Sequence, residues 1–149
     1  MDRDIESFLN CHSWAIVGAS SQPRSFGTYA YKELKEKGLD VVGVNPKYDE
    51  VNGDKCYGSL CELPKQPDAA LFLLPPWAAP AAVAEAKDAG ITKIWFQRGA
   101  NYDTAIEEAK KAGMTVVSGK CIMMFAAPVK GIHKFHRFLS RVTGHVMLT

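Results

Sequence analysis

Short apolar runs recur along the chain, separated by longer segments in which apolar and polar residues mix. Several runs are apolar at consecutive positions, which is typical of strands buried on both faces of a parallel sheet. Glycines and prolines stop several of these runs. The expected strands are residues 14–20, 40–45, 68–74, 93–96 and 115–117.

The segments between these runs have the spacing of amphipathic helices, and several stop at a glycine. The polar, glycine-containing residues 47–58 are expected to form a loop, and residues 59–63 a short helical turn. The expected helices are residues 2–10, 26–37, 77–89, 102–112 and 131–142.

Strand and helix alternate with a period of roughly 25 residues, which indicates βαβ units with right-handed crossovers. We therefore expect a Rossmann-like α/β fold with a five-stranded, mainly parallel sheet covered by helices on both faces. A chain of 149 residues suits one domain over residues 1–149. With strands numbered along the chain, the expected order is 3-2-1-4-5, which puts a ligand at the carboxyl ends of the strands, beside the first one.

Composition narrows the class of protein. The net charge of +2 is too small to indicate nucleic-acid binding by itself. The four cysteines match no zinc pattern, the first residues are charged, and no apolar run approaches membrane-spanning length. We expect a cytoplasmic protein without membrane or nucleic-acid contacts. The basic segment from Lys130 onward leaves open an acidic partner, an anionic ligand or solubility alone.

The turn after the first strand carries the clearest chemical signal. A glycine at the strand end permits a tight turn, the following helix presents free N–H groups, and an arginine is suited to grip phosphate. We interpret the turn as a phosphate-binding site, the alternative being a plain strand-to-helix connection. Its candidate residues are Gly18, Ala19, Ser20, Ser21, Arg24 and Ser25.

The second strand ends in Asn45, Pro46 and Lys47, without the carboxylate that NAD-binding folds place there. Lys47 suits a ligand with a ribose phosphate, such as coenzyme A (CoA) or NADP, although a solvated surface lysine explains it equally well. Pro75 and Pro76 end the third strand as a rigid lip over the crevice or as the start of a helix. Residues 97–99, which include Gly99, follow the fourth strand and face the same crevice.

Together these residues resemble the small single-domain CoA-binding proteins, which are similar to the N-terminal domain of the succinyl-CoA synthetase α-subunit. The resemblance spans about residues 10–122. It is carried by residues 14–20 (WAIVGAS), Pro23 with Arg24, residues 44–46 (VNP), Pro75 with Pro76, and residues 95–100 (WFQRGA).

The resemblance implies that CoA or an acyl-CoA binds through the turn at residues 18–25. Asn45, Pro46 and Lys47 would then lie near the ribose phosphate and adenine, and Pro75 and Pro76 along the pantetheine arm. The synthetase needs a domain with a phosphorylated histidine and a partner subunit, which do not fit in this length. The resemblance therefore implies binding without ligase activity, in a sensor or carrier.

Two other functions stay open. An NADP-dependent oxidoreductase would need a proton donor that the sequence does not reveal. A ligand-regulated interaction domain would use the basic C-terminal segment to contact a protein partner or a second copy. His133 and His136 lack a third ligand for a metal, no residue is assigned a catalytic role, and Cys121 is interpreted as structural.

Overall fold

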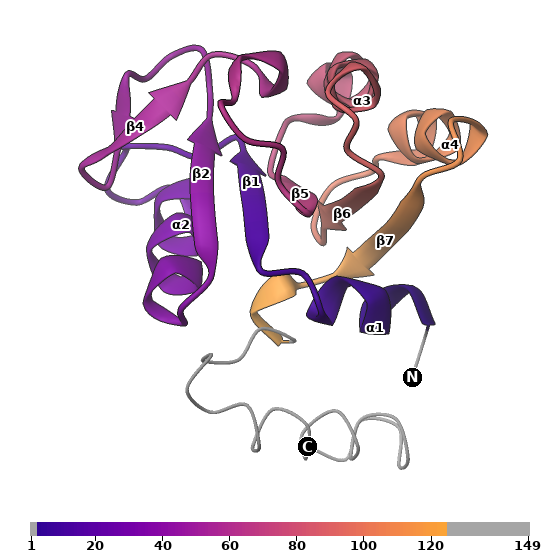
Figure 1. The fold of residues 1–149 in the computed structure, drawn as a ribbon, viewed down its shortest axis with the longest axis horizontal. Coiled ribbons are helices and arrows are strands. Elements are labelled where there is room, and N and C mark those ends of the chain that lie inside the picture. Colours follow the sequence, from indigo (N-terminus) through magenta and orange to yellow (C-terminus); the bar gives the residue numbers. More distant parts are fainter. Residues whose placement is uncertain (1–2, 125–149) are drawn as a thin grey trace.

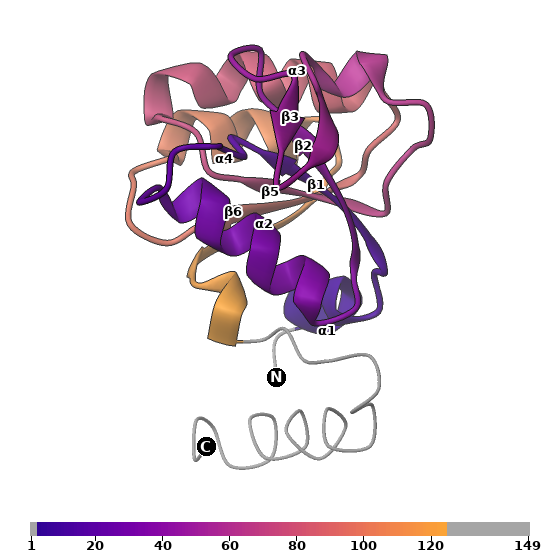
Figure 2. The ribbon, with the colours of Figure 1, turned by 90° about the vertical axis from the view of Figure 1, so that its left-hand side faces the viewer.

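A twisted sheet forms the middle of three layers, with helices packed on both of its faces (Figure 1, Figure 2). The computed structural model describes residues 3–124. The strands are β1 (Ser13–Val17), β2 (Asp40–Val44), β3 (Glu50–Val51), β4 (Asp54–Tyr57), β5 (Ala69–Phe72), β6 (Lys93–Gln97) and β7 (Thr115–Lys120). The helices are α1 (Arg3–Leu9), α2 (Phe26–Glu36), α3 (Ala79–Asp88) and α4 (Asp103–Lys111), with 3-10 turns η1 (Leu60–Glu62), η2 (Pro76–Ala78) and η3 (Ile122–Met124).

The sheet order is β3-β4-β2-β1-β5-β6-β7, and every pair is parallel except β3 with β4. The expected Rossmann-like α/β fold with a mainly parallel sheet is thus confirmed. The sheet has seven strands in the described residues rather than the five expected. The helix expected at residues 131–142 lies outside the described residues.

The expected loop at residues 47–58 contains the two additional strands, β3 and β4, so that prediction was wrong. Asn52 and Gly53 both have positive φ, 55° and 81°, and join the two strands as a two-residue turn. Such a turn matches the right-handed twist of the strands that it connects. Val51 and Cys56 are buried, and they give this otherwise polar segment its contact with the core.

The expected order 3-2-1-4-5 was also wrong, because β5 pairs with β1 and not with β2. β4 occupies the outer edge of β2, so β5 takes the free edge of β1. The chain therefore reverses its direction across the sheet between β1 and β5. Open α/β sheets bind ligands at such a reversal, outside the carboxyl ends of the strands.

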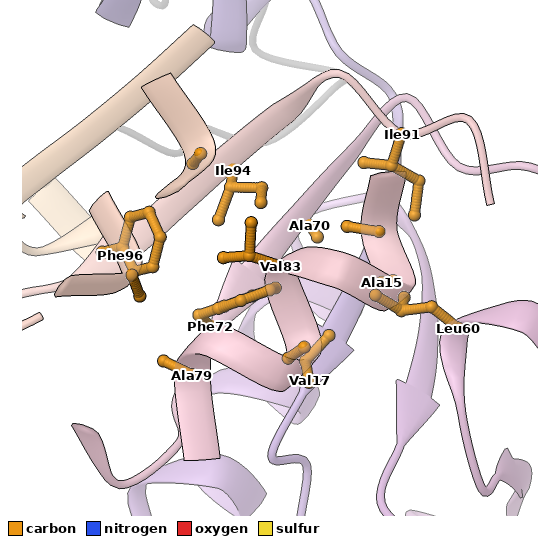
Figure 3. Close-up of a cluster of buried hydrophobic side chains, with 14 of the residues drawn as sticks. Ala15, Val17, Leu60, Ala70, Phe72, Ala79, Val83, Ile91, Ile94 and Phe96 are labelled. Atoms are coloured by element: carbon orange, nitrogen blue, oxygen red, sulfur yellow. The ribbon is translucent and has the colours of Figure 1, made fainter. Parts of the chain in front are cut away.

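Alternate residues of the central strands supply two separate cores. Ile16, Leu71 and Trp95 pack on the side covered by α1 and α2. Val17 and Phe72 point to the opposite side, where α3 and α4 lie (Figure 3). Burial on both faces explains why these strands are apolar at consecutive positions.

The amino-terminal ends of β1 and β5 are linked by Asp68. Its Oδ2 accepts hydrogen bonds from the backbone N–H groups of His12 (3.0 Å) and Ser13 (3.2 Å). The backbone N–H of Asp68 donates in return to the carbonyl of Ser13 (2.9 Å). The bonds from His12 and Ser13 hold the pKa of the Asp68 carboxyl below its usual value. β1 and β5, between which the sheet order reverses, are thus joined at their amino-terminal ends. The expected ligand site lies at their carboxyl ends.

The N-terminus of α2 rests directly on the end of β1, and two glycines allow it. Gly18 has a φ of +100°, and a Cβ there would lie 2.9 Å from the carbonyl oxygen of Leu73. A Cβ on Gly27, in the first turn of α2, would lie 2.5 Å from the carbonyl oxygen of Gly18. No real side chain tolerates that contact, so helix and strand approach backbone to backbone.

Within residues 3–124, none of the helices combines the length and the apolar character that a membrane span requires.

Replacing Gly27 by alanine tests this approach. We expect Gly27→Ala to lower the free energy of unfolding by about 1–3 kcal/mol, because the added methyl overpacks against backbone and outweighs the helix propensity gained. Urea denaturation measures the change. Lys32→Ala, on the exposed side of the same helix, is the control and should shift stability by less than about 0.5 kcal/mol. An equally small effect of Gly27→Ala would contradict the close contact.

Asp68→Asn tests the link between the strands. At neutral pH we expect a loss of about 1 kcal/mol, kept small because solvent screens this exposed carboxylate. The folded-state pKa is lowered, so the ionised carboxyl stabilises the fold above its unfolded pKa of about 3.9. The difference between wild type and variant should therefore shrink as the pH falls below about 4. Urea denaturation from neutral to acidic pH measures it, with Asp49→Asn as control; a pH-independent difference would refute the role of the charge.

Candidate functional site

The turn at residues 18–25 lies at the carboxyl ends of β1 and β2, which it ties together. The Gly18 N–H donates to the carbonyl of Val44 at 2.9 Å. Asn45 Nδ2 donates to the carbonyl of Ala19, also at 2.9 Å, and Asn45 Oδ1 accepts from the N–H of Lys47. The sequence-predicted residues of these two strand ends are thus brought together, with Asn45 as the bridge.

Serine side chains hold the turn in shape. Ser20 is buried, and its Oγ accepts from the N–H of Gln22 at 2.9 Å and donates to the Tyr48 hydroxyl at 3.4 Å. The bond from Ser20 lowers the pKa of the Tyr48 hydroxyl. Ser21 Oγ donates to the carbonyl of Glu50 at 2.6 Å. The turn is therefore anchored to the segment that leads from β2 into the β3–β4 hairpin.

Ser25 caps the N-terminus of α2. Its Oγ accepts from the N–H of Gly27 at 3.1 Å, and Thr28 Oγ1 donates to the carbonyl of Ser20 at 2.8 Å. The cap leaves the Ser25 hydroxyl hydrogen without an acceptor among the described residues. The Ser25 hydroxyl lies at the positive end of the helix dipole, and both favour an anion there.

Two cations lie in the exposed loops that follow the carboxyl ends of β1 and β2. Arg24 lies in the turn before α2, and Lys47 follows Asn45 and the exposed Pro46. Neither the guanidinium of Arg24 nor the ammonium of Lys47 forms an ion pair within residues 3–124. The strand ends therefore carry positive charge that the described part of the protein does not neutralise.

A cleft of about 300 Å³ runs from the turn across the ends of β5 and β6. Three of the sequence-predicted residues line it, namely Gly18, Ser25 and Gly99. Its remaining lining residues are Phe26, Gly27, Leu73, Leu74, Gln97, Arg98, Ala100 and Tyr102. The cleft thus joins an end lined by Gly18, Ser25 and Gly27 to an apolar floor of Leu73 and Leu74.

Pro75 and Pro76 follow the floor residues Leu73 and Leu74 directly along the chain. Both prolines are exposed and lie outside the lining of the cleft, and Pro76 begins η2. Trp77 comes next and is 84% exposed. The predicted lip therefore stands beside the cleft, and it also starts the helical segment, as the alternative interpretation expected.

The wall of the cleft opposite the turn, here called the far wall, consists of residues 97–100 and Tyr102 and is held by buried polar contacts. Gln97 is 9% exposed; its Nε2 lies 3.0 Å from Cys121 Sγ, and its Oε1 accepts from the N–H of Ile122 at 3.0 Å. The hydroxyl of Tyr102 donates to the carbonyl of Leu74 and so closes β5 against the start of α4. Burial raises the pKa of Tyr102, which keeps that hydroxyl protonated and donating.

Several site residues were missed from the sequence. Phe26, Leu73 and Tyr102 line the cleft, and Tyr48 supports the turn. Phe26 is the first residue of α2 and follows the N-cap Ser25, so recognising Ser25 as a cap could have placed Phe26 at the site. The contact between Tyr102 and Leu74 joins residues 28 positions apart, for which the chain shows no local signal.

The described residues contain no group of three His, Cys, Asp or Glu side chains able to hold a metal ion. His133 and His136, the pair considered from the sequence, lie outside them. Cys121, interpreted as a structural cysteine, is half-buried.

Comparisons with known proteins agree with this geometry. A family model described as a CoA binding domain matches residues 12–127. Subunit alpha of acetate–CoA ligase (ADP-forming) II from Pyrococcus furiosus is 28% identical over 129 residues, which cover 79% of this chain and 28% of the subunit. The chain spans less than a third of the length of the curated ligases first matched.

Two solved structures are similar over nearly their whole length. A conserved hypothetical protein from Pyrococcus furiosus is 43% identical, with a TM-score of 0.72, and the alignment covers 75% of this chain and 97% of that one. A hypothetical protein from Pyrococcus horikoshii is 32% identical, with a TM-score of 0.79, covering 93% and 92% of the two chains.

The matched region contains β1, the turn at residues 18–25 and every residue that lines the cleft. It also covers most of the chain, and it confirms the resemblance that the sequence motifs indicated. The chain therefore belongs to the CoA-binding domain family.

Proposed function

We propose that this protein binds coenzyme A or an acyl-CoA at the carboxyl ends of β1, β2, β5 and β6, as a non-catalytic carrier or sensor. The observation that carries the proposal is the backbone contact between Gly27 and Gly18, which aims the N-terminus of α2 into the cleft. Membership of the CoA-binding domain family supports CoA as the ligand.

The pyrophosphate sits at the turn in this proposal. Gly18, Ala19 and Ser20 shape it, and Ser21 anchors it to Glu50. Ser25 and the α2 N-terminus donate hydrogen bonds to the phosphate oxygens, and Arg24 supplies a bidentate cation. Arg24 makes no ion pair with any described residue, so ligand binding does not have to break one.

The rest of the ligand extends to both sides of the turn. Asn45, Pro46 and Lys47 lie beside the ribose phosphate and adenine, with Lys47 meeting the phosphate. The pantetheine arm crosses the apolar floor next to Pro75 and Pro76 and ends at the wall that contains Gly99. The floor suits this arm because its methylene groups gain from burial.

Ligase activity is not part of the proposal. The matched region is 28% of the Pyrococcus furiosus ligase subunit, so the activity in that protein's name is not carried over to this chain. Two of the solved structures that it matches over nearly their full length are those of hypothetical proteins, whose names assign no activity. A protein partner that receives or reads the bound CoA fits the carrier role.

Thermal unfolding with CoA, NAD, NADP and ATP in parallel tests the ligand class. A ligand that binds the folded state adds about 2.7 kcal/mol at a hundredfold excess over its Kd. We expect CoA to raise the melting temperature and the other three to have little effect. A shift with NADP alone would instead support an oxidoreductase.

Arg24→Ala tests the site itself. We expect the affinity for CoA to fall about 10- to 100-fold, since a charge-assisted hydrogen bond contributes about 1.5–3 kcal/mol. The affinity should also depend less on salt. Isothermal titration calorimetry measures both.

Lys87→Ala is the matched control. Lys87 lies in the last turn of α3, which ends near the amino-terminal ends of the strands, where Gln66 before β5 bonds the carbonyl of Gly90. The control should bind CoA as wild type does. An Arg24→Ala variant that folds and keeps its CoA affinity would rule out this phosphate site.

A further inference from the structure

The two ends of the cleft differ in chemistry, and this difference bears on the acyl group of the ligand. Gly18, Ser25 and Gly27 form one end, beside the turn, and Leu73 and Leu74 form the floor. The other end is made by residues 97–100, after β6. If CoA binds as proposed above, its pyrophosphate lies at the first end and its thiol points toward the second.

Two cations are neighbours at the second end. Arg98 follows β6 and Lys120 ends β7, and the N–H of Arg98 donates to the carbonyl of Lys120 at 3.3 Å. Both residues are exposed, and neither cationic group has an ion pair or hydrogen bond within residues 3–124. Like charges on adjacent strand ends repel each other, and an anion between them relieves the repulsion.

The cleft itself offers no such anion. None of its lining residues is an Asp or a Glu, and Arg98 is the lining residue that carries a charge. The phosphates of the ligand are engaged two strands away, because β5 lies between β1 and β6. In the proposed pose, Arg98 is therefore the charged residue at the end of the cleft toward which the thiol points.

We propose that the cleft selects an acyl-CoA whose acyl group ends in a carboxylate, and that Arg98 recognises this carboxylate with Lys120 beside it. The planar guanidinium matches a carboxylate in a bidentate pair. The side chain is exposed at the mouth of the cleft, so it reaches the acyl end without being buried as an unpaired charge. The inference rests on the proposed binding of CoA.

Matched ligands test the inference. Succinyl-CoA and butyryl-CoA have acyl groups of similar shape that differ by a carboxylate in place of a methyl group. Isothermal titration calorimetry gives the Kd of each for wild type, Arg98→Ala, Arg98→Gln and the control Lys110→Ala, which removes an exposed cation from α4. Thermal unfolding of each variant checks its fold.

We expect wild type and Lys110→Ala to bind succinyl-CoA about tenfold more tightly than butyryl-CoA. In both Arg98 variants this ratio should fall to about one. Equal affinities in wild type would overturn the inference. A ratio that persists in the Arg98 variants would also overturn it, because a group other than Arg98 would then recognise the carboxylate. Failure of wild type to bind CoA itself would overturn the proposed function instead.

Discussion

The site depends on one contact, in which the backbone of α2 meets the backbone of β1 at Gly27 and Gly18. Because no side chain separates them, the first turn of the helix lies directly over the strand end. Its N–H groups then point at the place where the sheet reverses between β1 and β5. The cap by Ser25, the bridge from Asn45 and one end of the cleft all lie next to this contact.

Much of the architecture could be predicted from the sequence because its signals are local. Strands buried on both faces are apolar at consecutive positions, as in residues 69–72 and 94–96, and their ends follow from prolines and glycines. The turn at residues 18–25 could be singled out for a similar reason. Its glycine, serines and arginine fall within eight residues, so one short segment is enough to predict a phosphate site.

What could not be predicted depends on contacts between distant segments. Residues 50–57 carry an Asn-Gly turn signal, but only Val51 and Cys56 are buried, so their pattern is weak. Once this hairpin adds β4 to the edge of β2, β5 is left with the edge of β1, and the order of the sheet changes. The far wall of the cleft likewise requires Tyr102 to reach Leu74, with η2, α3 and β6 lying between them along the chain.

The hydrogen bonds that hold the turn are made by the protein with itself. Ser20 is bonded to Gln22 and Tyr48, Ser21 to Glu50, and Thr28 closes back onto Ser20. An anion that binds as proposed above therefore meets a turn that is already ordered, because the conformational entropy of this loop was lost when the chain folded. Association at this edge can then proceed by rigid docking, with the rate set by diffusion and charge steering and without a rearrangement of the loop.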